Sequence, residues 1–345
     1  MNWRRKVSAF FSVALALLFA DLMSCRANPP CRYDDPSCKT EALTQWLGIL
    51  LAPVNCTDDA LAWTSVPAAE ASGWWTVTYG DRGFVALAIN GTNFVMHSPT
   101  GLTWTSHSAA ENNLWRGVTF GEGIYVGVAS SGTNRVMISS GGMNWSPIAS
   151  PEANSWQAVT YGNGRFVAVS SDGTNRVMWS EDGMSWNPAM AVEANSWRAI
   201  HFGSGRFVAV STNGTNQVML STDGATWTPA SPASGDQWLA LGSDSGRYIS
   251  LANSGANRVM RSLDGTNWTG HPATGANQWS SVAGGGGVFV GVADDGFAMT
   301  SVDGITWTDM PPPEAIQWKS VAFGDAKFVS VSATGTNRVM YASCD

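Results

Sequence analysis

The sequence predicts an all-β fold, a seven-bladed β-propeller of four-stranded blades, and three observations lead to it. Tryptophans recur along the chain at a spacing of 41 residues, shortened to 39 at the last step. Each repeat contains four short runs rich in Val, Phe, Tyr and Trp, separated by Gly, Asn, Asp and Ser. No run of helical length survives between these turn signals, which disfavours a helical repeat.

Fourteen of the 18 tryptophans occupy two fixed positions of the repeat. The first position is held by Trp74, Trp115, Trp156, Trp197, Trp238, Trp279 and Trp318. The second position, 11 residues earlier, is held by Trp63, Trp104, Trp145, Trp186, Trp227, Trp268 and Trp307. A period near 40 residues with four strands in each unit is typical of propeller blades.

One unit shows the expected strands in order. WQAVTYG at 156–162 is the inner strand a, RFVAVSS at 165–171 is strand b, RVMWS at 176–180 is strand c, and SWNPA at 185–189 is the outer strand d. The chain ends before its last unit has a strand d, whereas residues 57–63 are in phase with the missing turn and strand. We therefore expect an N-terminal strand d to complete the last blade, which removes two unpaired edges.

Residues 1–24 predict a secretion signal, since basic residues at 4–6 precede an apolar run at 7–20 that is too short to span a bilayer. Leu-Met-Ser-Cys at 22–25 resembles the lipobox of bacterial lipoproteins. The resemblance implies that Cys25 carries lipid, that residues 25–39 form a tether, and that Arg26 directs the protein to the outer membrane. Cleavage after Ala27, giving a freely secreted extracellular or periplasmic protein, is the alternative.

The remaining four cysteines are an even set that suits an oxidising compartment. Four cysteines allow three pairings, and we favour Cys56 with Cys344 across the ring closure and Cys31 with Cys38 in a local loop. Residues 40–52 read as a short amphipathic helix, so 40–56 form a lead-in and 57–345 form the propeller.

The formal net charge of −7 argues against nucleic acid as a partner. The histidines show no metal-ligand spacing, and the Gly-rich segments precede no helix that would bind phosphate. We therefore expect no metal and no cofactor, and we expect a monomer that reaches a membrane only through its lipid anchor.

Four units carry Ser-x-Asp-Gly-x-x-Trp before the second tryptophan, with the carboxylates Asp182, Asp223, Asp264 and Asp303. A short carboxylate there can accept backbone N–H bonds within the turn, and Gly takes the strained φ. The motif resembles the Asp-box of sialidase-type (BNR) repeats, although it is one residue shorter. The resemblance covers residues 57–345 and implies a sialidase-like propeller, in which these carboxylates are structural and lie on the face opposite the pocket.

A second set of polar residues lies in the b–c hairpins and the d–a loops, which propeller geometry places on one face. The hairpins carry Arg135, Arg176, Arg258 and Arg338, and the loops carry Glu111, Glu152, Glu193, Asn154 and Asn195. In a structural interpretation, each Arg pairs with the Glu of the neighbouring blade. In a functional interpretation, the face binds glycan, anion or peptide. The sixth unit breaks the repeat with a shortened hairpin containing Asp294 and Asp295, so we expect any site beside it.

Sialidase chemistry requires an arginine triad, a Tyr activated by Glu, and an acid Asp. The chain lacks the Phe/Tyr-Arg-Ile-Pro motif of that family, and its hairpin arginines recur with the repeat. We therefore expect no catalytic residues, and we expect a binding or scaffolding propeller of the bacterial cell envelope with glycan or an envelope protein as its partner. The alternatives are a sialidase-like glycoside hydrolase or lyase, and an assembly factor for envelope proteins.

Overall fold

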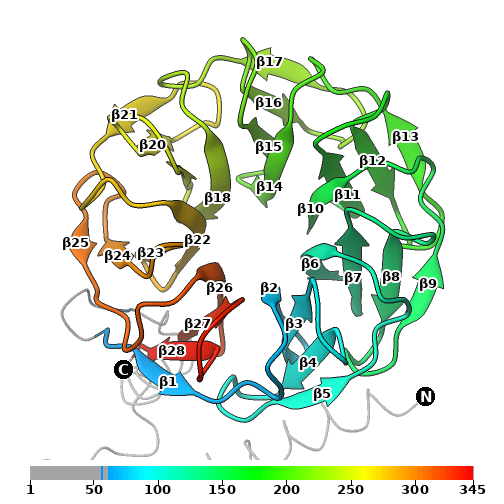
Figure 1. Cartoon of the computed structure of the whole chain (residues 1–345). Helices are drawn as coiled ribbons and strands as arrows, with labels where there is room; N and C mark the ends of the chain where they lie inside the picture. The colour runs from blue at the N-terminus through cyan, green and yellow to red at the C-terminus, as the bar shows by residue number, and fades with distance from the viewer. Residues whose placement is uncertain (1–55, 57–60, 345) are drawn as a thin grey trace, which may run out of the picture. The chain divides into compact units, whose positions relative to one another are not determined.

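The computed structural model describes Cys56 and residues 61–344, which belong to one compact unit, Val54–Asp345. The predicted signal, tether and helix, including Cys25, Cys31 and Cys38, lie outside the described residues. The described regular structure is 28 β-strands in seven four-stranded antiparallel sheets, arranged in a ring (Figure 1). The predicted seven-bladed propeller is confirmed.

The blades repeat one strand plan. The inner strands a are β2 (Trp74–Gly80), β6 (Trp115–Gly121), β10 (Trp156–Gly162), β14 (Trp197–Gly203), β18 (Trp238–Asp244), β22 (Trp279–Gly285) and β26 (Trp318–Gly324). Strands b are β3 (Gly83–Ala88), β7 (Ile124–Ala129), β11 (Arg165–Ser170), β15 (Arg206–Ser211), β19 (Arg247–Ala252), β23 (Val288–Ala293) and β27 (Lys327–Ser332). Strands c are β4 (Val95–Ser98), β8 (Val136–Ser139), β12 (Val177–Ser180), β16 (Val218–Ser221), β20 (Val259–Ser262), β24 (Ala298–Ser301) and β28 (Val339–Ser343). The short outer strands d are β1 (Thr64–Val66), β5 (Thr105–His107), β9 (Ser146–Ile148), β13 (Asn187–Ala189), β17 (Thr228–Ala230), β21 (Thr269–His271) and β25 (Thr308–Asp309).

The hydrophobic core lies between blades. Each strand a begins with a fully buried tryptophan of the first series, and the strands b are buried on both faces because a neighbouring blade covers each of them. In one such layer, Trp156 packs with Val126 and Val128 of the preceding blade. Each blade therefore depends on its neighbours for burial, as expected for a repeat fold.

The N-terminal strand closes the ring. β1 pairs antiparallel with β28, with Thr64 opposite Tyr341 and Val66 opposite Val339, and the two lie side by side in Figure 1. The strand starts immediately after Trp63, as β13 starts immediately after Trp186, and residues 57–60 of the predicted segment lie outside the described residues. A disulfide joins Cys56 to Cys344 across 288 residues, the pair favoured from the sequence.

At the a–b end of the channel, glycine and aromatic residues of neighbouring blades fit together. The last residue of strand a is usually Gly, and the aromatic residue one position earlier on the next blade covers it. A Cβ atom on Gly162 would lie 2.0 Å from Phe202, and one on Gly324 would lie 2.0 Å from Tyr79. These glycines are required because the aromatic rings occupy the space that a side chain would need.

We expect Gly162→Ala to lower the free energy of unfolding by about 2 kcal/mol, because the added methyl group must displace the Phe202 ring. Urea unfolding measures the change. Gly235→Ala is the control, since nothing lies within 4 Å of its added Cβ. Equal stability of the two variants would contradict this account of the inter-blade packing.

Candidate binding mouth of the central channel

The hairpin arginines connect neighbouring blades through backbone carbonyls. Arg176 Nη1 donates to the oxygen of Ser171 in its own blade at 3.1 Å and to that of Asn195, before the next strand a, at 2.7 Å. Arg135, Arg258 and Arg338 make the corresponding bonds to Asn154, Asn277 and Ser72. The expected Arg–Glu pairing is wrong: none of the four ion pairs in the described residues involves these arginines.

The loop glutamates bind the hairpin of their own blade. Glu152 accepts hydrogen bonds from Asn175 Nδ2 at 2.5 Å, from the Asn175 backbone N–H at 3.1 Å, and from Asn154 Nδ2 at 3.1 Å. Glu111 and Glu193 make the corresponding bonds to Asn134 and Asn216, and Asn195 donates to the Asn216 carbonyl. Burial raises the pKa of all three carboxyls, but these hydrogen bonds outweigh it and leave the pKa below its ordinary value.

The lowered pKa of these glutamates makes stability depend on acid. The pKa of these glutamates is lower in the folded protein than in the unfolded chain. Their contribution to the free energy of unfolding is therefore complete above the unfolded-state pKa and is lost as the pH falls through the folded-state pKa. We expect the free energy of unfolding to fall less between about pH 5 and pH 3 in the triple Glu→Gln variant at 111, 152 and 193 than in the wild type. Urea titrations at several pH values test this, and parallel pH profiles would contradict it.

The carboxylates of the four Ser-x-Asp-Gly-x-x-Trp motifs hold the c–d turns. Asp182 Oδ1 accepts the backbone N–H bonds of Met184 and Ser185 at 2.8 Å each, and Gly183 takes a φ of +74°. The other three turns make the same bonds through Asp223, Asp264 and Asp303. These turns lie beside the a–b hairpins, since Arg165 in β11 donates to the Asp223 carbonyl at 2.7 Å. They are therefore on the face opposite the arginine hairpins.

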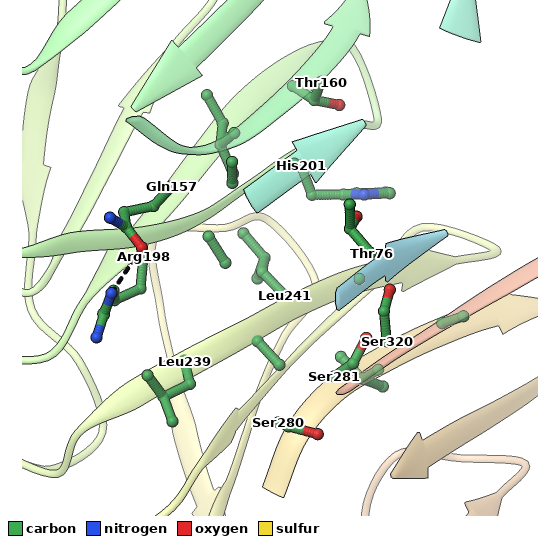
Figure 2. Close-up of a pocket in the computed structure, with 18 of the residues that line it drawn as sticks. Thr76, Gln157, Thr160, Arg198, His201, Leu239, Leu241, Ser280, Ser281 and Ser320 are labelled. Carbon is green, nitrogen blue, oxygen red and sulfur yellow. Dashed lines mark hydrogen bonds between the residues drawn. The ribbon is translucent and has the colours of Figure 1, made fainter. Parts of the chain in front are cut away.

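The ring encloses a central channel of about 920 Å³, lined by strand a of every blade. In Figure 2, Gln157, Arg198 and Leu239 lie toward one end of this cavity, and Thr160 and His201 lie toward the other. The first group follows the buried tryptophans of strand a, at the mouth on the face of the d–a loops and b–c hairpins. A cavity of this size falls within the range of ligand pockets.

The residue that follows the buried tryptophan differs in nearly every blade. This ring at the mouth consists of Trp75, Arg116, Gln157, Arg198, Leu239, Ser280 and Lys319. Its members combine three cations, one indole and three uncharged side chains. A site that breaks sevenfold symmetry can recognise one ligand in one orientation, which the repeated hairpins cannot do.

Two guanidinium groups are held at this mouth without a carboxylate. Arg198 Nη1 donates to Gln157 Oε1 at 2.6 Å (Figure 2). Gln157 Nε2 donates in turn to the hydroxyl oxygens of Ser155 and Ser171. Arg116 donates through Nε to Ser130 Oγ at 3.2 Å. Among the described residues, no ion pair involves either arginine.

The indole of Trp75 lies between cations from both neighbouring blades. Its ring centroid is 4.3 Å from the Arg116 guanidinium carbon and 4.7 Å from Lys319 Nζ. Lys319, whose side chain is only 9% exposed, also pairs with Asp294 Oδ2 at 2.8 Å. Asp294 of the irregular sixth unit thus lines the channel, whereas Asp295 accepts a hydrogen bond from the backbone N–H of Gln278.

The electrostatics of the mouth favour an anion. Burial lowers the pKa of Arg116 and Arg198, and the positive charge of Arg198 lowers that of Arg116 further, although arginine stays protonated. Three buried polar atoms of the lining have no hydrogen-bond partner: Arg198 Nε, Asn253 Oδ1 and Asp294 Oδ1. Buried polar atoms normally have partners, so a ligand that carries an anionic group for Arg198 and hydrogen-bond donors for the two oxygens would complete the site.

The structure thus separates the predicted site residues into two groups. The arginines, glutamates and asparagines of the loops make inter-blade and intra-blade contacts, while Asp294 lies in the channel lining. The ring at the mouth was missed, although its signal is in the sequence: the slot after the strand a tryptophan is the variable one. No group of three or more His, Cys, Asp or Glu in residues 61–344 could hold a metal ion.

Comparisons with known proteins place the chain among β-propellers. A family model described as the DUF6242 beta propeller domain matches residues 98–237, and comparison with curated proteins gave no match. Virginiamycin B lyase from Staphylococcus aureus has a TM-score of 0.72 at 12% identity, covering 82% of this chain and 98% of that one. YCF48 bound to D1 peptide has a TM-score of 0.63 at 16% identity, covering 86% of this chain and 98% of that one. BamB from Moraxella catarrhalis has a TM-score of 0.50 at 8% identity, covering 81% of this chain and 97% of that one. At these identities the structural likeness shows the fold alone.

Proposed function

We propose that this chain is a binding propeller that takes an acidic segment of a partner protein into the channel mouth on the face of the d–a loops and b–c hairpins. The observation that carries the proposal is the pair Arg116 and Arg198, which both line the mouth and take part in no ion pair among the described residues. The pair is basic in a chain whose formal net charge is −7. Such a local charge attracts an anionic ligand over the background of the whole surface.

The chemistry of the mouth suits a carboxylate on a polypeptide. A guanidinium group binds a carboxylate through two parallel N–H···O bonds, and the flat Trp75 indole offers an apolar surface beside it. A neutral glycan would gain nothing from the two positive charges. The fold neighbour YCF48, described with a bound D1 peptide, supports a polypeptide ligand.

Fluorescence anisotropy with a labelled hexaglutamate peptide tests the proposal. We expect saturable binding that weakens as the salt concentration rises, because the interaction is between charges. A hexalysine peptide and a hexaserine peptide of the same length are the controls and should not bind. Failure of hexaglutamate to bind at low ionic strength would overturn the proposed function.

We also propose that the protein is exported and anchored to the bacterial envelope through lipid on Cys25. The disulfide between Cys56 and Cys344 supports an oxidising compartment. The part of the chain that the structure describes contains no helix long and apolar enough to cross a membrane. Metabolic labelling with a palmitate analogue tests the anchor: incorporation that Cys25→Ser abolishes is expected, and an unlabelled protein released from cells would favour cleavage after Ala27.

A further inference from the structure

The end of the channel opposite the basic mouth also departs from the repeat. On five blades the sixth residue of strand a is aromatic and covers the terminal Gly of the preceding blade. These residues are Tyr79, Phe120, Tyr161, Phe202 and Phe323. Ser243 replaces the aromatic residue on β18, and Gly284 replaces it on β22.

Between β18 and β22 the side chain and the glycine exchange places. On β18 the terminal glycine is itself replaced by Asp244, and the Cβ of Asp244 lies 2.7 Å from the place where a Cβ on Gly284 would be. Two adjacent aromatic rings are therefore absent from the channel lining between Phe202 and Phe323. We call this stretch of the lining the notch; Phe202, Ser243, Gly284 and Phe323 all line the channel.

The polar groups of the notch are uncharged or already paired. His201 occupies a position that is Thr on three blades, and its Nε2 lies 2.9 Å from Ser243 Oγ. Burial lowers the pKa of His201 to about 4, so the imidazole is neutral at physiological pH. The carboxylate of Asp244 faces Arg247 at 3.6 Å. The notch therefore offers neutral hydrogen-bonding groups between two aromatic walls.

We propose that the notch receives an aromatic side chain, preferentially Tyr, from the same acidic segment that binds the basic mouth. The side chains that the notch lacks relative to the other blades are aromatic, and ring-to-ring contacts of a ligand with Phe202 and Phe323 would replace those the repeat makes elsewhere. A phenol hydroxyl would reach the His201–Ser243 pair, which a phenylalanine ring cannot use. This inference rests on the proposed function and adds the identity of the second anchoring group.

The spacing of the two anchors follows from the strand. The mouth residue Arg198 and the notch residue Phe202 are four positions apart on β14, which corresponds to about 13 Å in an extended chain. An extended ligand running along the channel would therefore carry its carboxylate and its aromatic ring about four residues apart. The channel crosses the full length of strand a, so one segment can reach both ends.

Blocked heptapeptides of Gly and Ser containing one Asp and one Tyr test the proposal in the full protein. The separation of the two residues is varied from one to six, in both orders, and binding is measured by anisotropy. We expect the tightest binding at a separation of about four, about tenfold tighter than with Ala in place of Tyr, and an intermediate affinity with Phe. If peptides with Tyr bind no more tightly than peptides with Ala at any separation, the proposal that the notch receives Tyr is overturned.

A variant that restores the repeat provides the matched test. The double variant His201→Thr and Ser243→Phe installs the residue types found at Thr160 and Phe202, and Gly203 already leaves room for the ring. We expect it to lose the gain from Tyr while it binds the Asp-only peptide as the wild type does. The proposal would be overturned if Tyr still improved binding to this variant. It would also be overturned if Tyr improved binding to the wild type at no separation. Loss of binding of every acidic peptide by the wild type would instead refute the proposed function.

Discussion

Replacing Arg116 and Arg198 together by Gln is expected to weaken the binding of hexaglutamate about 100-fold. Each guanidinium group would make charge-assisted hydrogen bonds to a carboxylate, and such bonds contribute about 1.5 to 3 kcal/mol each. Gln keeps a polar side chain of similar width but carries no charge. Anisotropy titrations of the two single variants and the double variant measure the loss and show whether the two arginines act together.

The same double variant is expected to be at least as stable as the wild type. In the free protein the two positive charges repel each other and are partly desolvated, so their presence opposes folding. Residues that reduce stability yet bind ligand are typical of functional sites. Urea unfolding of the ligand-free proteins measures this, and a large loss of stability would mean that the arginines are structural.

A matched control removes two charges from the same face without touching the mouth. Arg135→Gln with Arg176→Gln changes the net charge equally, and Gln217 already occupies the corresponding position of the neighbouring blade. Gln217 Nε2 donates to the carbonyls of Ser211 and Asp236, the partners that an Arg would have there. We expect the control to retain hexaglutamate binding within about threefold. Equal losses in the two double variants would mean that only the overall charge of the face matters.

The sequence predicted the fold because its signals are local and repeated. The spacing of the tryptophans set the blades, the turn residues set the strand ends, and the missing strand d implied the closure by β1. The partners of the hairpin arginines could not be predicted in the same way. Spacing places Arg176 near the next d–a loop, but the side chain is long enough to reach either the carboxylate or the Asn195 carbonyl. Glu193, the carboxylate of that loop, is held by Asn216 in its own blade, which leaves the Asn195 carbonyl for Arg176.

The basic mouth was missed for a different reason. Its residues lie within strand a, where the alternation of apolar residues suggested core, and no single arginine there stands out in the sequence. Their placement at one mouth depends on the circular arrangement of the blades, because Arg116 lies on β6 and Arg198 on β14, two blades further along the chain. The useful signal is the contrast between neighbouring slots: Trp is constant at the first position of strand a, and the next position varies. In a symmetric repeat, the positions that vary indicate the site.

Replacing Cys56 and Cys344 together by Ala is expected to lower the free energy of unfolding by about 5 kcal/mol at most. The disulfide joins residues 288 apart, and the reduction in unfolded-chain entropy grows with the length of the closed loop. The non-covalent part of the closure consists of the three-residue strand β1, the packing of Leu61 and Trp63 in the core of the last two blades, and the hydrogen bond from the Cys56 N–H to the Gly286 carbonyl. Guanidinium unfolding with and without reductant measures the contribution.

Reductant should destabilise the wild type and leave the Cys56→Ala, Cys344→Ala variant unchanged. If it destabilises both equally, the effect comes from another pair, such as Cys31 with Cys38. The position of the bond also predicts how the ring fails. The ring closes where β1 pairs with β28, and these two strands come from opposite ends of the described chain. Without the disulfide, the ring should therefore begin to open between β1 and β28. Hydrogen exchange should therefore increase first at Val339–Ser343 in the variant, and uniform loss of protection around the ring would contradict this.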